Sequence, residues 1–374
     1  MTLTFDRAAY GHRASPFEGS LSKDFAQDWR QISGLRHIDA ALSDDGRHVL
    51  ERIAPGDIDA RLAAGQTICA DITTEPSVRL LLDTLCDFLG TPKGGFAKLY
   101  VSPNGAGFPL HFDPHHVFVV QCAGEKRWTH GVTPALPNAR EPGRMGEHGP
   151  VFGGRLDGAP LVGKAGAVEA PTDLAETRLT PGTGLYLPPG TWHRAEAVGT
   201  SIAVSLSPPR FTPFALIQEW LEARALVHPE WFADLPLHEA GSARASSTSE
   251  HRLSDALATM RDELNAPAQH WVRRWLAALS VEGEGTRAEI GRSTKLTRVS
   301  PLAYIEDDAA LVFYGGGQEW SLPPKARPFL DGLAGTRAFT AEDVLLWDDA
   351  LRWPAAKELL EALLDGGLLR RTRP

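Results

Sequence analysis

Residues 108–128 read FPLHFDPHHVFVVQCAGEKRW, and this stretch decides how the rest of the chain is interpreted. His111 and Asp113 stand two residues apart, so on a β-strand their side chains would point to the same face. The apolar run VFVVQ that follows predicts a strand, and CAGEK after it predicts a turn. We therefore expect a histidine and a carboxylate side by side on one face of a sheet.

A second segment supplies a matching histidine. The sequence LTPGTGLYLPPGTWHRAEA at 179–197 places His193 just after a Pro-Pro-Gly turn, at the start of the next predicted strand. Two imidazoles and one carboxylate on one side of a metal, with open positions opposite, is the arrangement of non-haem Fe(II) oxygenases. A His-x-Asp pair alone occurs often by chance, so the prediction of a metal site rests on both segments together.

Strand-length runs surround these motifs. AKLYV at 97–101, GLYL at 184–187 and IAVSL at 202–206 are separated by Gly and Pro, and this spacing is typical of a barrel or double sheet. In residues 77–89 one broad apolar face predicts a helix that covers the sheet. The side chains expected on that face are Leu80, Leu81, Leu85, Phe88 and Leu89.

Two segments look less regular. Residues 1–45 are expected to form an irregular arm, with Phe25 and Trp29 as anchors onto the body. Residues 134–178 are dominated by Gly, Pro and charged residues, and we interpret them as a long surface insertion within the barrel. Insertions of this length often act as lids or substrate loops.

The chain becomes helical after Pro209. One helix is expected over 214–226, and a Ser-rich break at 240–250 precedes a second, in which Leu253, Leu257, Met260 and Leu264 form an apolar stripe. A third carries Trp271, Trp275 and Leu279. Because these helices have no evident core of their own, we expect a dimer interface here.

The last part of the chain combines a strand pair with short helices. ALVFY at 310–314 and GQEWSL at 317–322 predict the strands, and three helical segments follow around 328–333, 341–346 and 355–364. This order describes a winged helix.

The two motif segments resemble the JmjC-type cupins, specifically the ribosomal-oxygenase branch of Fe(II)- and 2-oxoglutarate-dependent hydroxylases. The resemblance runs through residues 99–128 and 179–198. It implies that His111, Asp113 and His193 bind Fe(II) and are the catalytic centre.

The same resemblance assigns the cosubstrate residues. It implies that Lys126 binds the distal carboxylate of 2-oxoglutarate, and that Tyr100 and Ser205 also contact this cosubstrate. A fixed cation suits an anionic cosubstrate in a partly dry barrel, and lysine provides a compact point charge. The competing interpretation of Lys126 is a solvated lysine in a turn.

Two features depart from the branch. His115 and His116 stand where polar or acidic residues are expected, which puts the choice of substrate in doubt. We favour a place in the substrate channel or in solvent for both rings over metal ligation, because a further ligand would close a needed open site. The insertion at 134–178 is unusually rich in Gly and charge, so the mouth of the barrel should differ too. Trp128 and Trp192 are interpreted as core.

The expected fold is a double-stranded β-helix of the cupin type, mainly β barrel, followed by α-helical parts. We assign residues 1–213 to the catalytic domain with its N-terminal arm, 214–290 to a helical dimerisation region and 291–374 to a winged-helix-like domain. A homodimer follows from the resemblance.

Composition limits the partners. The chain has 374 residues, 38 Lys and Arg against 47 Asp and Glu, and a net charge of −9, so nucleic acid is not favoured and a basic substrate fits better. Cys69, Cys86 and Cys122 form no close pair, which favours a reducing interior. The sequence shows neither a secretory signal pattern nor an apolar run long enough for a membrane span, and a cytoplasmic protein is expected.

The sequence thus predicts an oxygenase that hydroxylates a peptide or protein side chain, either in a ribosomal protein or in a biosynthetic peptide. Two alternatives remain open. One is a cupin dioxygenase or isomerase that uses no 2-oxoglutarate and has no need of Lys126. The other is a non-catalytic metal cupin or winged-helix sensor.

Overall fold

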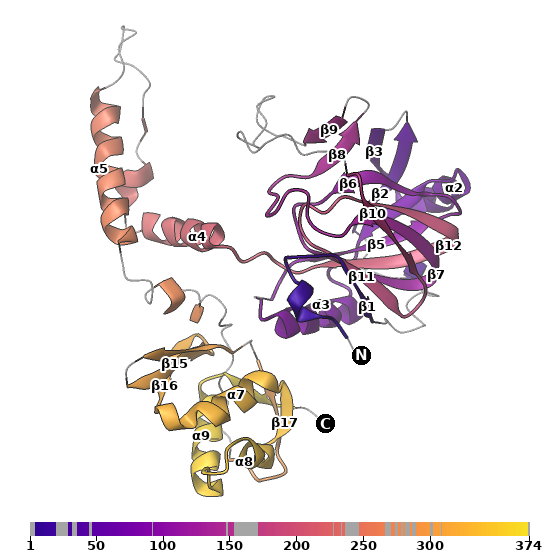
Figure 1. Cartoon of the computed structure of the whole chain (residues 1–374). Coiled ribbons are helices and arrows are strands. Elements are labelled where there is room, and N and C mark those ends of the chain that lie inside the picture. The colour runs from indigo at the N-terminus through magenta and orange to yellow at the C-terminus, as the bar shows by residue number, and fades with distance from the viewer. Residues whose placement is uncertain are drawn as a thin grey trace. The chain divides into compact units, whose positions relative to one another are not determined.

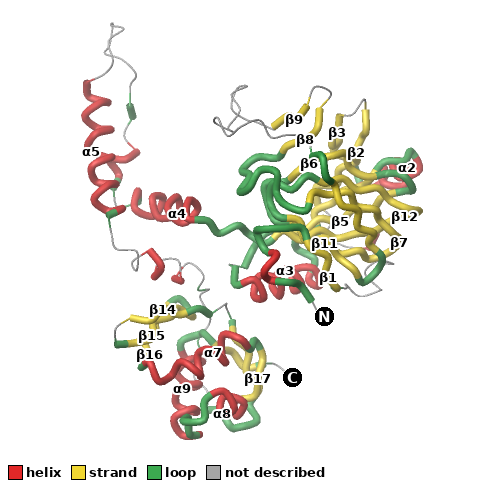
Figure 2. Tube along the Cα trace, in the orientation of Figure 1, coloured by secondary structure: helices red, strands yellow, loops and turns green. Residues whose placement is uncertain are grey.

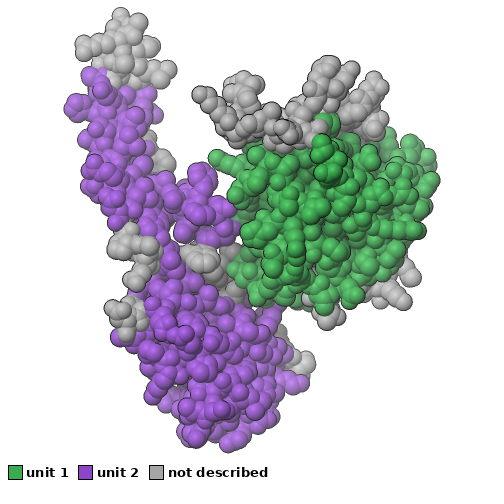
Figure 3. Space-filling model, viewed as in Figure 1, with its two compact units in different colours: residues 1–210 green, residues 211–374 purple. Residues whose placement is uncertain are grey.

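One large antiparallel sheet organises residues 1–210, the first of the two units into which the chain divides (Figure 3). Residues 211–374 form the second unit. The structure is a computed structural model. It describes residues 4–19, 29–31, 36–44, 47–91, 93–146, 149–152, 171–226, 228–232, 234–235, 247–265, 271–273, 276–277, 280, 285, 289–299, 302–307 and 309–372.

Twelve strands form the sheet (Figure 2). They are β1 (Ser15–Glu18), β2 (Arg36–Asp44), β3 (Arg47–Arg52), β4 (Thr67–Asp71), β5 (Phe96–Ser102), β6 (Gly107–Phe112), β7 (Val117–Gly131), β8 (Gly143–Gly146), β9 (Gly149–Phe152), β10 (Leu174–Leu179), β11 (Thr183–Leu187) and β12 (His193–Ser207). Their main order is β1-β11-β7-β12-β5-β4-β2-β3, with β10 paired to β7, β6 to β12, β8 to β6 and β9 to β8 (Figure 1). The expected strands at 97–101, 117–121, 184–187 and 202–206 all lie within members of this sheet.

The expected turn at CAGEK is wrong, because β7 runs through it as one strand of 15 residues. Gly124 takes a φ of +63°, and its Cα lies so close to Thr200 that a Cβ would meet the Thr200 carbonyl oxygen. The pairing of β7 with β12 shifts register between Val198 and Ile202. Gly124 therefore lies in a β-bulge through which the strand continues, and Lys126 stands within a strand instead of a turn.

The N-terminal segment is more regular than expected. Within residues 1–45, β1 pairs with β11 and β2 pairs with β3 and β4, so the prediction of an irregular arm is wrong for these strands. Trp29 is buried, and it belongs to the same apolar core as Phe5 and Phe17. Phe25 lies outside the described residues. The described residues of this unit also include short 3-10 helices at Arg7–Ala9, Trp29–Gln31 and Pro55–Asp57.

Helix α3 (Pro76–Leu89) packs against the sheet, as its apolar pattern predicts, and α2 (Ile58–Ala63) precedes β4. The buried side chains of α3 are Val78, Leu81, Leu82, Leu85 and Cys86. Leu80, which the prediction placed on the buried face, is 61% exposed. The core stripe is centred on the 78–82–85 row, and this leaves Leu80 on the opposite side of the helix.

The second unit contains helices and two small sheets. Its helices are α4 (Pro213–Ala225), α5 (Ser247–Leu264), α7 (Arg327–Gly335), α8 (Val344–Trp347) and α9 (Trp353–Asp365), with 3-10 turns at Pro229–Phe232, Pro324–Ala326 and Ala341–Asp343. One sheet is β17-β13-β18 and the other is β14-β15-β16. Their strands are β13 (Lys295–Arg298), β14 (Tyr304–Asp307), β15 (Ala310–Gly315), β16 (Gln318–Leu322), β17 (Ala338–Thr340) and β18 (Leu369–Arg371). The helices expected at 214–226, 328–333, 341–346 and 355–364 and the strands expected at 310–314 and 317–322 are therefore present, whereas most of the helix expected around Trp271 falls outside the described residues.

The leucine stripe of α5 is solvent-exposed, with Leu253 49% and Leu257 55% accessible. Trp271 packs edge-on against Trp220, with ring centroids 5.2 Å apart. Trp275, Leu279 and residues 240–246 of the expected Ser-rich break lie outside the described residues, and Ser247 already begins α5. The division at residue 290, the winged helix and the dimer stay predictions. No helix within the described ranges has the length and apolar character that crossing a membrane requires.

Candidate functional site

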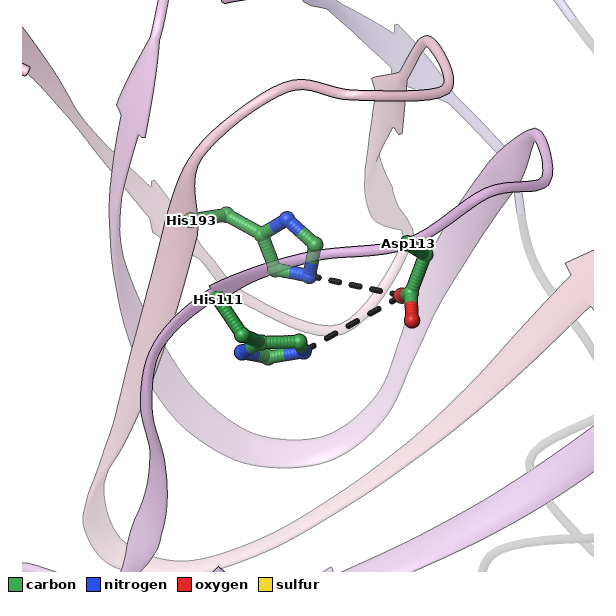
Figure 4. A group of neighbouring side chains, drawn as sticks. All are labelled: His111, Asp113 and His193. Carbon is green, nitrogen blue, oxygen red and sulfur yellow. Dashed lines mark ion pairs between the residues drawn. The ribbon is translucent and has the colours of Figure 1, made fainter. Parts of the chain in front are cut away.

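Three side chains with metal-ligating atoms converge at one end of the sheet. His111 lies on β6, Asp113 follows that strand, and His193 is the first residue of β12 (Figure 4). The Asp113 Oδ2 atom is 4.0 Å from His111 Nε2 and 3.6 Å from His193 Nε2. One ligand atom from each residue lies within 4.8 Å of the others. The two sequence motifs thus meet in space.

Strand pairing and one turn produce this convergence. His111 and His193 are register partners between β6 and β12. The Gly190 amide donates to the Asp113 carbonyl oxygen over 2.8 Å, so the Pro-Pro-Gly turn is tied directly to the His-x-Asp segment. Gly190 has a φ of +79°, and a Cβ there would meet the Leu136 carbonyl oxygen. Glycine is therefore required at this position.

The hydrogen bonds of the imidazoles suit metal binding. His111 Nδ1 donates to the Pro109 carbonyl over 2.7 Å, and His193 Nδ1 donates to the Thr191 carbonyl over 2.9 Å. A carbonyl oxygen can only accept, so each Nδ1 carries the proton and each Nε2 presents a lone pair towards Asp113. This backbone-oriented tautomer is the usual state of a metal-binding histidine. The donor set fits a divalent metal of the Fe(II) type.

The charge states agree with this assignment. Burial lowers the pKa of His193 to about 3, so its ring is neutral at physiological pH. Burial acts to raise the pKa of Asp113, but the adjacent rings of His111, His115 and His193 outweigh it and the net pKa is lowered. The site therefore offers neutral imidazole and an anionic carboxylate, which are the protonation states that a metal needs.

A cavity of about 400 Å³ opens beside the three side chains. Its walls are mainly apolar and aromatic, as is usual for sites that take small molecules. It is lined by Leu50, Cys69, Phe96, Lys98, Tyr100, Phe108, Pro109, His111, Asp113, His115, Val117, Val119, Lys126, Trp128, Pro142, Gly143, Arg144, Met145, His193, Ala195, Ala203 and Ser205. All six residues that the sequence assigned to metal or cosubstrate are among them.

Lys126 is 2% exposed, which excludes the solvated lysine. Its Nζ donates to Ser102 Oγ over 3.0 Å and lies 5.7 Å from the centre of the Tyr100 ring. Burial lowers the pKa of Lys126 to about 8. A buried ammonium group with no carboxylate among its described partners is a group that an anionic ligand would stabilise.

Tyr100 and Ser205 occupy neighbouring walls of the cavity. Tyr100 lies on β5 and packs edge-on against Phe108, with ring centroids 5.5 Å apart. Burial, with Cys69 and Asp113 nearby, raises the pKa of Tyr100 well above its ordinary value, so its hydroxyl stays protonated. Ser205 is a buried residue of β12 and is the register partner of Lys98.

The two extra histidines separate to opposite sides of the chain. His115 lines the cavity, with its Nε2 atom 3.9 Å from Asp113 Oδ2 and its ring edge-on to Phe96. His116 instead lies in the core, where its ring stacks on Tyr10 and its Nδ1 atom hydrogen-bonds to the Tyr186 hydroxyl over 2.8 Å. The expectation of a channel or solvent position is therefore wrong for His116. Side chains that alternate across an extended segment cannot both face the cavity.

His116 should make the stability of the first unit depend on pH. Burial lowers its pKa to about 3, whereas an unfolded histidine titrates near about 6.5. Below pH 6.5 the unfolded chain binds a proton that the folded chain excludes, so stability falls by about 1.4 kcal/mol per pH unit from this residue. We expect the His116→Gln variant to lose less unfolding free energy between pH 6.5 and 5.5 than the wild type does, measured by denaturant titration. Equal losses in both proteins would contradict this assignment.

The insertion contributes strands to the cavity mouth. Within 134–178, β8 and β9 form a hairpin and β10 pairs with β7. Residues 142–145 line the cavity, and Arg144 is the register partner of His111. Residues 147–148 and 153–170 lie outside the described residues. The described part of the insertion is thus an element of the site.

Trp128 and Trp192 are both buried, in line with their interpretation as core. Trp192 packs edge-on against Phe112, with ring centroids 4.9 Å apart, and Trp128 also lines the cavity.

Sequence reasoning missed Ser102 and Lys98. Both stand two residues from Tyr100 on β5, so strand periodicity places Lys98, Tyr100 and Ser102 on one face. The alternation of side chains along this strand could therefore have predicted that Lys98 and Ser102 share the face of Tyr100.

Comparison with known proteins agrees with the geometry. A family model of the JmjC domain matches residues 68–147, which include β5 to β7, both residues of the His-x-Asp pair and Lys126. Residues 68–147 therefore resemble a JmjC domain. The resemblance of the chain to the ribosomal-oxygenase branch, predicted from the motifs, is confirmed by the relatives found.

Three curated relatives match the JmjC region in part. The Bacillus subtilis protein YxbC is 31% identical over 134 residues, covering 35% of this chain and 40% of that protein. Jumonji C domain-containing protein 5 of Drosophila melanogaster is 30% identical over 118 residues, covering 31% and 28%. Ribosomal oxygenase 2 of Bos taurus is 34% identical over 101 residues, covering 27% and 17%. The chain thus matches less than half the length of each.

Solved structures of the Escherichia coli ribosomal oxygenase YcfD resemble the whole chain. The structure in complex with cobalt and 2-oxoglutarate has a TM-score of 0.53 at 18% identity, covering 99% of both chains. The structure with cobalt and succinic acid has a TM-score of 0.52, also at 18% identity and with the same coverage. This likeness shows the fold, and the predicted cupin-like architecture of the JmjC unit is confirmed.

Proposed function

We propose that this protein is an Fe(II)- and 2-oxoglutarate-dependent oxygenase that hydroxylates a side chain of a peptide or protein. The observation that carries the proposal is one cavity lined by both halves of a His-Asp-His set and by a buried lysine. The E. coli structures with cobalt and 2-oxoglutarate or succinic acid have the same fold, which supports these cofactors for this chain. Bound together, Fe(II) and 2-oxoglutarate supply the O2 activation that inserts an oxygen atom into a C–H bond.

Each residue has a defined part in this proposal. His111, Asp113 and His193 would hold the metal, and three protein ligands would not saturate it. Lys126 holds the distal carboxylate of 2-oxoglutarate, with Ser102 keeping its ammonium group in place over 3.0 Å. Tyr100 and Ser205 contact the cosubstrate. The apolar walls, such as Val119 and Ala203, exclude water from the reacting atoms.

The substrate follows from the relatives only as a class. The ribosomal oxygenases among them favour a ribosomal protein, and a biosynthetic peptide remains the other candidate.

We propose that the protein acts as a homodimer through residues 214–290, carries a winged-helix-like domain at 291–374 and works in the cytoplasm. The exposed leucines of α5 support the dimer.

The burial of Lys126 disfavours the alternative of a cupin dioxygenase or isomerase that uses no 2-oxoglutarate. A lysine at 2% exposure is costly to bury, and an iron enzyme with no anionic cosubstrate would gain nothing from it. The sensor rival predicts metal binding with no 2-oxoglutarate turnover.

One titration tests the proposal. The Fe(II)-loaded protein is titrated with 2-oxoglutarate in the absence of O2, and a weak visible charge-transfer band is expected as the cosubstrate chelates the metal. No band in the metal-loaded protein would overturn the proposal and favour the cosubstrate-free rival. Incubation of a positive preparation with ribosomal proteins, followed by mass spectrometry for the gain of one oxygen atom, then tests the substrate class.

A further inference from the structure

The cavity is strongly biased towards positive charge. Among the described residues that line it, Asp113 is the only acidic one, whereas Lys98, Lys126 and Arg144 are all basic. In the proposed function, the charges of Fe(II) and Lys126 balance those of Asp113 and the two carboxylates of 2-oxoglutarate. Lys98 and Arg144 then remain uncompensated.

Lys98 stands apart from the cosubstrate lysine. It lies on the same face of β5 as Ser102, the partner of Lys126, but four residues away, which is about 13 Å along a strand. Lys98 instead lies near the metal end, because its Nζ is 5.8 Å from the centre of the Phe96 ring, and that ring packs edge-on against His115, whose Nε2 is 3.9 Å from Asp113 Oδ2. Lys98 is therefore placed beside the open side of the site, away from the distal carboxylate.

The surroundings of Lys98 leave its charge available. Its Nζ lies 5.8 Å from the centre of the Phe96 ring, and it forms no ion pair within the described part of the chain. Asp71, its register partner on β4, instead accepts a hydrogen bond from the Thr73 amide over 2.8 Å. A half-buried cation without a carboxylate partner is a binding group for an anion.

Arg144 adds a second cation from a different strand. It is exposed on β8 at the cavity lining and likewise forms no ion pair with the residues that the structure describes. Since β5 and β8 are not neighbours in the sheet, the two cations approach the cavity from separate walls. A side chain entering there would meet a positive potential from both.

We propose that the substrate presents a carboxylate, that of a glutamate or aspartate side chain, to Lys98 and Arg144 in this cavity. This inference rests on the proposed function and names its substrate class. The net charge of −9 favoured a basic substrate, but an overall charge is spread over the whole surface, and the local field of the cavity has the opposite sign. An arginine or lysine side chain would be repelled where an acidic one is held.

Binding of small probes to the intact chain tests this. The protein is loaded with Mn(II), which supports binding without turnover, and saturated with 2-oxoglutarate. The N-acetyl amides of glutamate, glutamine and arginine are then compared through the relaxation that Mn(II) induces in their protons. We expect the glutamate amide to bind about tenfold more tightly than the glutamine amide, and the arginine amide to bind most weakly.

Variants identify the residues responsible. In the Lys98→Gln/Arg144→Gln double variant, the preference for glutamate over glutamine is expected to fall to about twofold or less. Lys325→Gln, which removes one exposed positive charge in the second unit, serves as the matched control and should keep the full preference. The Mn(II) affinity of each variant reports whether its metal site is folded, and the single variants are measured in case the double variant is not.

Three outcomes would overturn the inference. One is undetectable binding of the glutamate amide, or binding no tighter than that of the arginine amide. Another is an unchanged preference in the folded double variant. The third is a tenfold loss of 2-oxoglutarate affinity in Lys98→Gln, which would assign Lys98 to the cosubstrate. Failure of the proposed function gives a different result, because the wild type would then not bind 2-oxoglutarate at all. The relative affinities of the three amides can still be measured on the Mn(II)-loaded protein in that case.

Discussion

Replacing Asp113 with alanine is expected to lower the affinity for a divalent metal by at least about 100-fold, because it removes the anionic member of the ligand set. The remaining His111 and His193 rings would hold the ion through two neutral nitrogens only. Mn(II) or Co(II) titration by calorimetry measures the change. Catalysis should be lost with the metal, whatever the substrate.

Two control variants make this result specific. Asp71→Asn removes a carboxylate from the neighbouring strand β4 while keeping an acceptor for the Thr73 amide, and it should leave metal affinity unchanged. His115→Ala tests the alternative ligand, since His115 Nε2 lies only 3.9 Å from Asp113 Oδ2. We expect a change of about threefold or less for His115→Ala. A loss as large as that of Asp113→Ala would show that His115 belongs to the ligand set.

Replacing Lys126 with methionine is expected to weaken 2-oxoglutarate binding by about 100-fold, since a charged hydrogen bond in a dry cavity is lost. Methionine fills most of the space of the lysine chain, so the packing around this 2%-exposed position is retained. The anaerobic titration described above measures the affinity. Metal affinity should not change, because Lys126 provides no metal ligand.

The pH dependence of the same titration adds a second readout. Burial lowers the pKa of Lys126 to about 8, so its charge is present below pH 8 and is lost as the pH rises through that value. The wild type should therefore bind 2-oxoglutarate up to about tenfold more weakly per pH unit above 8. Lys126→Met should lack this dependence. Equal pH profiles in the two proteins would rule out Lys126 as the group that holds the carboxylate.

The proposed metal ligands were accessible from sequence because each motif is local. His111 and Asp113 share a face through their spacing, and His193 follows a Pro-Pro-Gly turn whose residue types are diagnostic. The strands and helices were likewise visible in periodicity. The exception at residues 122–126 has a local cause, since the left-handed Gly124 looks like a turn in sequence but forms a β-bulge in the sheet.

The positions and burial of the Lys126 and His116 side chains depend on long-range packing. Lys126 could equally have been a solvated lysine until β12 paired alongside β7 and Ser102 on β5 accepted a hydrogen bond from its ammonium group. His116 could have faced the channel until Tyr10 and Tyr186, from distant parts of the chain, enclosed it. No local pattern encodes such contacts.

The sequence by itself determined the ligand types, their spacing and the strand pattern, because these follow from short-range periodicity and turn chemistry. Only the tertiary structure decided the sign of the field in the cavity. Lys98, Arg144 and Lys126 come from three strands separated in the chain, and the net charge of the whole molecule has the opposite sign. Electrostatic interactions act through space over a few ångströms, so the arrangement of strands in the sheet sets them, and their order along the chain does not.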